Sequence, residues 1–182
     1  THVVVAYYAQ TEGTLHLARW LRGDSPSGAS FSDTVLDASS TDVGESVGLA
    51  IDGNDTIYLA YIDRINKTLR GAMVFSNWSA QTGTIAGGAD GVVVGDYCDI
   101  ALNHAVPADK VAVVYQAISG PGAPSQYPTI FTGAAGPLPA ANPGSYNLAF
   151  VKGAATAPQQ ANLGRYCSAA YDNFGNLHIA YF

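Results

Sequence analysis

The chain has 182 residues, of which 48% are hydrophobic and 12% are charged, and its formal net charge is −6. This length and apolar content suit a folded domain and exclude a disordered chain, and two Glu and three Lys are too few for a coiled coil. Eight Lys and Arg argue against nucleic-acid binding, which needs clustered positive charge. No run of about 20 apolar residues is present, so we expect no membrane span.

A short apolar motif that ends in Tyr recurs four times, at residues 3–7, 57–61, 111–115 and 177–181. Its tyrosines are spaced by 54, 54 and 66 residues. Runs of Val, Ile, Leu and Tyr of this length are typical of buried strands. The spacing of about 50 residues predicts a repeated structural unit.

Other predicted strands recur in fixed order around this motif. One precedes it at residues 43–52, 94–103 and 163–172, one follows it at residues 14–20, 68–74 and 145–151, and a weaker fourth is expected in stretches such as 32–36 and 91–94. Residues 52–55 and 172–175 have the Asp, Asn and Gly content of hairpin turns. We therefore expect consecutive strands to be antiparallel neighbours.

A repeat of about 50 residues with four short strands has the size of a propeller blade. The pattern Ala-x-Asp, a short turn, Leu-His-Ile-Ala-Tyr and a following Thr-Leu-x-x-Ala resembles the degenerate repeats of bacterial extracellular β-propeller proteins, over nearly the whole chain. The predicted fold is all-β, a propeller-like array of about three four-stranded antiparallel blades, incomplete at both ends. We divide this single repeat region at approximately 1–42, 43–93, 94–162 and a partial repeat 163–182.

The phase of the repeats predicts that the chain starts and stops inside a blade. Both ends supply the same kind of strand, and about three blades are fewer than the roughly four to eight of a closed propeller. We therefore expect part of a larger propeller, either a fragment or a protomer whose terminal strands pair with its own kind or with other propeller segments. A proline-rich insertion at 119–145 is either a binding loop or an exposed excursion.

The sequence contains only weak matches to catalytic and metal-binding motifs. Gly44 to Gly48 match the G-x-S-x-G elbow of hydrolases, but Ser46 aligns with Tyr97 and Tyr166 of the sister repeats at the entry to a strand, so we expect no catalytic residue there. The four histidines lack metal-binding spacing, and we expect no metal site and no cofactor. Calcium stays open as an alternative, because Asp52, Asn54, Asp55, Asp172 and Asn173 carry oxygen ligands, although Asx side chains also stabilise turns.

Cys98 and Cys167 occupy equivalent positions of successive repeats. Packed sheets lie about 10 Å apart, whereas a disulfide needs α-carbons within roughly 7 Å. We therefore predict that the two cysteines are buried and not bonded to each other.

The first predicted function is a non-catalytic extracellular or cell-surface module for protein interaction or assembly. The alternative is a lectin-like, carbohydrate-binding propeller, since sugar sites combine aromatic faces with polar groups, and its candidate binding residues are Trp20, Arg19, Arg70, Trp78, Tyr127 and Phe131. A glycoside hydrolase comes third, because it needs two converging carboxylates. Glu12 and Glu45 are the glutamates, and no spacing selects a pair among the aspartates.

Overall fold

The computed structural model describes residues 1–26, 28–88, 93–104, 110–119, 127–134, 147–150 and 165–182. These residues form strands and turns with no α-helix, as expected of an all-β chain. In this described part, no helix is long and apolar enough to cross a membrane.

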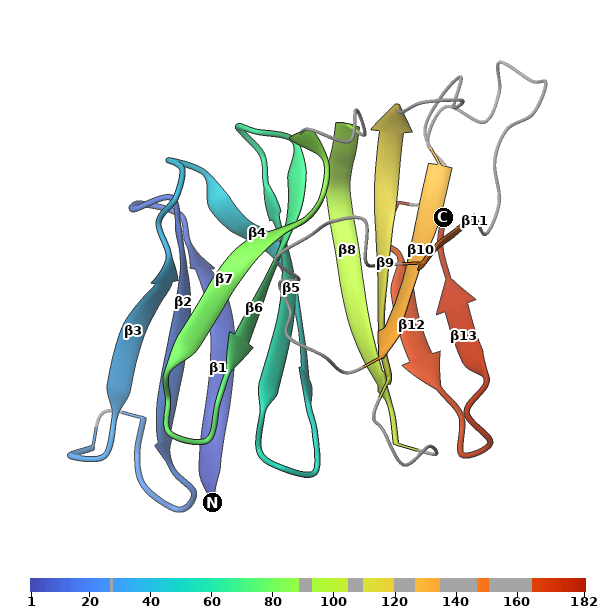
Figure 1. The fold of residues 1–182 in the computed structure, drawn as a ribbon. Coiled ribbons are helices and arrows are strands. Elements are labelled where there is room, and N and C mark those ends of the chain that lie inside the picture. Colours follow the sequence, from blue (N-terminus) through green and yellow to red (C-terminus); the bar gives the residue numbers. More distant parts are fainter. Residues whose placement is uncertain (27, 89–92, 105–109, 120–126, 135–146, 151–164) are drawn as a thin grey trace.

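The described residues form thirteen strands in four antiparallel sheets, each built from strands that are consecutive in the chain (Figure 1). The first sheet holds β1 (His2–Ala9), β2 (Thr14–Leu21) and β3 (Ser32–Asp37). The second holds β4 (Val43–Ile51), β5 (Ile57–Asp63), β6 (Thr68–Val74) and β7 (Ala80–Ala86). The third holds β8 (Val93–Asn103), β9 (Lys110–Ser119), β10 (Tyr127–Ala134) and β11 (Asn147–Phe150), and the fourth holds β12 (Ser168–Tyr171) and β13 (Leu177–Ala180).

The predicted hairpins are confirmed where the strands were identified from the motif. The motif strand β5 pairs with β4 on one side and β6 on the other, β1 pairs with β2, and β12 pairs with β13. The turn chemistry is also as expected. Asp52 Oδ1 accepts hydrogen bonds of 2.8 Å from the backbone N–H groups of Asn54 and Thr56, and Asp172 Oδ1 accepts equivalent bonds from Phe174 and Asn176. Each Asp thus stabilises the tight turn between two strands.

Two strand assignments from the sequence are wrong. In the third repeat, residues 145–151 were expected beside the motif strand, but β10 pairs with β9 there, and β11 pairs with the far side of β10. The predicted insertion therefore contains a strand of the sheet. In the second repeat, residues 91–94 were expected to form the fourth strand, but this strand is β7, and Val93 and Val94 begin β8. The two errors have different causes. β7 (AQTGTIA) is an outer strand, polar and half-exposed, and lacks the apolar motif. β10 (YPTIFTGA) lies between β9 and β11, but its Pro128 and the prolines around it are typical of a loop.

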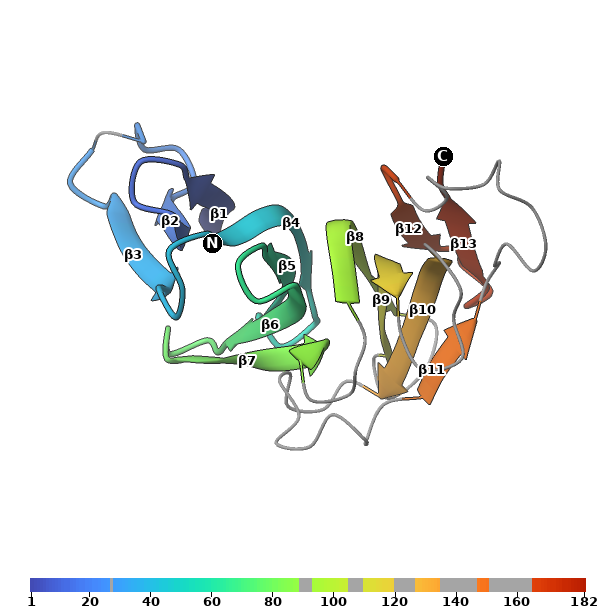
Figure 2. The same cartoon turned by 90° about the horizontal axis from the view of Figure 1, so that it is seen from above.

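The sheets stack face to face in chain order, as the view in Figure 2 shows. Side chains of a strand point alternately to its two faces, and both faces of β5 are covered. Ile57, Leu59 and Tyr61 pack in the core between the first and second sheets. Tyr58, Ala60 and Ile62 pack in the core between the second and third sheets. We call the face that points to the preceding sheet the head face and the one that points to the following sheet the tail face.

This stack has the layered, antiparallel character that was predicted, at the level of an all-β fold. The described strands follow one another as an open array, so the propeller arrangement stays a prediction.

Candidate functional site

In the part of the chain that the structure describes, no sheet covers the head face of the first sheet. Val5 of β1 occupies the motif position of Leu59 in β5 and Val113 in β9, both of which are completely buried, yet 42% of Val5 is exposed. Phe31 and Val35 are exposed as well. Trp20 of β2 lies on this face and contacts Phe31, with 6.5 Å between the ring centroids. An apolar strand position that is buried in both sister sheets is thus open to solvent here.

Among the described residues, none forms a sheet over the tail face of the fourth sheet. Ala180 occupies the motif position of Ala60 and Val114, both completely buried, and is itself exposed. Its partner across the hairpin is Ser168, and Ala170 is paired with His178, so these four residues share one face. All four are exposed. The described array therefore ends in one open head face and one open tail face.

The contact between the first two sheets shows how a covered head face, that of the second sheet, binds the sheet before it. Tyr61 OH donates a 2.6 Å hydrogen bond to Asp37 Oδ2, and Arg70 Nε donates one of 2.7 Å to the same oxygen. Asp37 belongs to the outer strand β3 of the preceding sheet, and its side chain is only 3% exposed. Burial raises the pKa of Asp37, but hydrogen bonds from Tyr61, Ser39 and Arg70 outweigh it, and the pKa lies below its ordinary value.

The open head face carries the equivalent pair of positions, Tyr7 and His16. No described sheet covers this face, and here the two side chains bind Asp33 of β3 and Glu12 of the turn between β1 and β2. Tyr7 OH donates a 2.6 Å bond to Asp33, which raises the pKa of Tyr7 to about 12. His16 is buried, with Nδ1 3.3 Å from Asp33 Oδ1 and Nε2 3.0 Å from Glu12 Oε2. Tyr7 and His16 therefore have hydrogen-bond partners without a second sheet. The apolar side chains of this face, in contrast, stay exposed to solvent.

The predicted binding residues do not form one cluster. Trp20 lies on the open head face, and the Arg70 guanidinium is engaged by buried Asp37. Tyr127 and Phe131 belong to β10 of the third sheet, opposite Ala117 and Val113. Arg19 and Trp78 do come together, with the guanidinium carbon 3.8 Å from the indole centroid. The Arg19 Nη1 atom is buried without an acceptor among the described residues, so the indole is its main partner.

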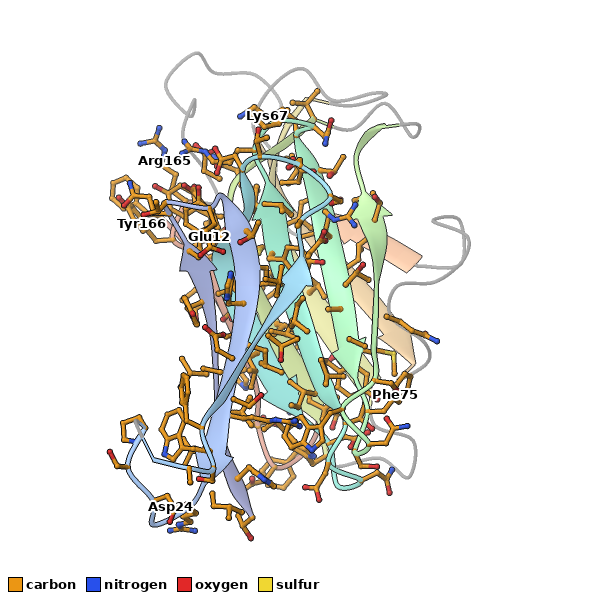
Figure 3. The ribbon with its side chains drawn as sticks, turned by 90° about the vertical axis from the view of Figure 1, so that its left-hand side faces the viewer. Glu12, Asp24, Lys67, Phe75, Arg165 and Tyr166 are labelled. Atoms are coloured by element: carbon orange, nitrogen blue, oxygen red, sulfur yellow. The ribbon has the colours of Figure 1, made fainter. Side chains whose placement is uncertain are left out.

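A cavity of about 250 Å³ adjoins Trp78 and is lined by residues of three segments at one end of the first two sheets. We call it the Trp78 pocket. His2 comes from the start of β1, Asp55 from the turn between β4 and β5, and Phe75 and Ser76 from the turn after β6. Figure 3 shows Phe75 at the end of the stack away from Glu12 and Tyr166. Sequence analysis named Asp55 for calcium alone and did not include His2, Phe75 or Ser76 among the binding residues, because only the stacking of two sheets brings these turns together.

The candidate nucleophile Ser46 is engaged by the backbone of the next sheet. Its Oγ accepts a 3.0 Å bond from Cys98 N–H and lies 3.3 Å from the Cys98 carbonyl oxygen, to which it can donate. Ser46 has φ of 51°, and so has Tyr166, the residue with which it was aligned. This geometry supports a structural role, a bridge between β4 and β8, the first strands of the second and third sheets.

Cys98 and Cys167 are both free and buried. Burial raises the pKa of Cys98 well above its ordinary value and, together with the charge of Asp99, that of Cys167 to about 12. Thiols in this state are poor nucleophiles.

Each of the two glutamates shares a partner with one aspartate. Glu12 and Asp33 contact the two ring nitrogens of His16, at 3.0 and 3.3 Å. Glu45 and Asp96 both contact the Arg64 guanidinium, at 3.2 and 3.5 Å. No group of three His, Cys, Asp or Glu side chains that could hold a metal ion occurs among the described residues. Asp52 and Asp172, named above for calcium, bind the backbone of their own turns.

The chain matches no protein-family model, and no curated protein matches its sequence. Its function is therefore inferred from its own geometry.

Proposed function

We propose that this chain is a non-catalytic assembly module, in which the tail face of one copy docks on the head face of a second copy. The single observation that supports this most directly is the contrast at equivalent motif positions. Val5 and Ala180 are exposed where Leu59, Val113, Ala60 and Val114 are completely buried.

The internal interfaces provide the template for this docking. The second sheet presents its head face to the first sheet and its tail face to the third, and apolar side chains fill both cores. One open face is a head face and the other is a tail face. The tail face of a second copy can therefore cover the open head face, and its head face can cover the open tail face. Such a contact joins different surfaces of the two copies, which makes it heterologous.

The chemistry of the open faces fits a sheet as the occupant. Three of the four residues of the tail face, Ser168, Ala170 and Ala180, have small side chains that let another backbone approach closely. The fourth, His178, is held by Asp172, with 3.1 Å between Nε2 and Oδ2. The head face carries Val5, Val35, Trp20 and Phe31, which gain from being removed from water. Exposed apolar clusters of this kind are typical of interaction surfaces.

Light scattering over a range of protein concentrations tests the proposal. The 18.8 kDa chain should form larger species as concentration rises. Val5→Arg or Ala180→Arg should abolish this association, because each introduces an unpaired charge into the interface at a position that the single chain leaves exposed. Ile65→Arg is the control, since Ile65 is 61% exposed in a turn outside both faces. A wild-type chain that stays at 18.8 kDa, or an equal effect of Ile65→Arg, would refute the proposal.

The extracellular or cell-surface setting expected from the repeats belongs to this proposal, as does closure of the assembled sheets into a propeller. The setting rests on the resemblance of the repeats, and closure rests on that resemblance together with the stacking of the sheets.

A further inference from the structure

We propose that the Trp78 pocket binds one ring of a neutral sugar. This inference goes beyond assembly, because the pocket lies between the first two sheets of a single chain. Its volume of about 250 Å³ lies slightly below the roughly 300–1,000 Å³ of typical ligand pockets and suits a single ring better than an extended oligosaccharide.

The walls of the pocket combine flat rings with polar groups. Phe75, Trp78 and His2 supply rings, against which the C–H face of a pyranose can pack. Asp55 supplies carboxylate acceptors, and Ser76 supplies a hydroxyl that both donates and accepts. A sugar ring complements these walls, because it has an apolar C–H face and carries hydroxyl groups around its edge.

The central indole is held in place before any ligand arrives. Arg19 stacks on its ring, and the ring of His2 meets it edge to face, with 5.1 Å between the centroids. The backbone N–H of Trp78 donates a 2.7 Å bond to the Phe75 carbonyl, in a turn where Trp78 has φ of 67°. A rigid aromatic wall loses little conformational freedom on binding, which favours a small ligand.

The charges at the pocket favour a neutral ligand. Asp55 is the carboxylate among the lining residues. No Lys or Arg side chain lines the described walls, and the nearby Arg19 guanidinium is engaged by the Trp78 ring, 3.8 Å from its centroid. A negatively charged sugar would be repelled by Asp55, whereas the hydroxyls of a neutral sugar can donate to it.

The two tryptophans allow a direct binding test. In a Trp20→Phe chain, Trp78 is the single tryptophan and reports on its own pocket. We expect at least one neutral methyl glycoside of glucose, galactose, mannose or N-acetylglucosamine to shift its fluorescence saturably, with Kd of about 1 mM or tighter. Glucuronate, which adds a negative charge, and mannitol, which has no ring, should bind at least tenfold more weakly.

Two variants connect the signal to the pocket. Asp55→Asn keeps the shape of an exposed turn residue and suits its φ of 61°, and it should weaken binding about fivefold or more. Trp78→Ala, measured by calorimetry in a chain whose circular dichroism is unchanged, should abolish binding. The proposal is overturned when no neutral glycoside saturates, when Asp55→Asn binds as tightly as the parent, or when glucuronate binds as well as the neutral sugars. Titrating the Val5→Arg chain separates this result from assembly, because its pocket is intact.

Discussion

Asp37 shows at the scale of one residue how two sheets are joined. Its carboxylate comes from β3, and both of its strongest donors, Tyr61 and Arg70, come from the second sheet. A buried carboxylate is costly unless hydrogen bonds and an opposite charge compensate it. The contact therefore helps to set how the first two sheets are aligned relative to each other. The apolar side chains of the core between these sheets supply most of the stabilisation.

Asp37→Asn should lower the free energy of unfolding by about 3 kcal/mol, because the charge of Arg70 would stay buried without a counter-ion. Urea denaturation measures the change. Glu45→Gln is the matched control. Its partner Arg64 is 41% exposed, and exposed ion pairs contribute about 1 kcal/mol or less. Equal losses in the two variants would contradict the role given to Asp37.

Acid should remove the contribution of Asp37. Because the pKa of Asp37 is lower in the folded chain than in the unfolded chain, its ionisation stabilises the fold. This contribution is fully present above the unfolded value of about 3.9 and is lost as pH falls through the lower folded-state pKa. The stability difference between wild type and Asp37→Asn, measured by urea denaturation, should therefore shrink as pH falls below about 4. A difference that stays constant down to about pH 2 would contradict this assignment.

At the scale of the element, an irregular start of β4, the first strand of the second sheet, lets neighbouring sheets approach. The pairing of β4 with β5 shifts register on either side of Glu45, next to Ser46 with its positive φ. Gly44 has φ of 117°, and a Cβ there would lie 2.8 Å from the Cβ of Leu15 in the preceding sheet. The glycine thus serves two needs, a backbone conformation that other residues avoid and a close contact between sheets.

Three Gly→Ala substitutions separate these two needs. Gly53→Ala should change stability by less than about 0.5 kcal/mol, because its Cβ meets nothing and its φ is not positive. Gly23→Ala, with φ of 101° and open space around it, should cost about 1 kcal/mol. Gly44→Ala combines the positive φ with the contact to Leu15 and should cost more than about 2 kcal/mol. Urea denaturation gives the order, and a Gly44→Ala chain as stable as Gly23→Ala would show that the close contact is unimportant.

At the scale of the whole molecule, the described sheets form an ordered stack. No described residue covers the head face of the first sheet or the tail face of the fourth. Sequence reasoning predicted the inner hairpins well, because β5 and β9 are continuous apolar strands with covered faces and bounded by turns. It failed for β7 and β10, whose polar residues and Pro128 resemble a loop when no neighbouring strand is known. Arg19 and Trp78 were both named as candidate binding residues, but their contact could not be predicted. The two lie 59 residues apart in the sequence, and only the packing of the first sheet on the second brings them together.

The most direct test of docking between head and tail faces is the mass, by light scattering, of an equimolar mixture of Val5→Arg and Ala180→Arg chains. Each variant keeps one intact face, so each should be monomeric alone at 18.8 kDa. In the mixture, the intact tail face of the first variant meets the intact head face of the second, and association should stop at twice that mass. A mixture that stays monomeric, or a single variant that dimerises with itself, would contradict the account.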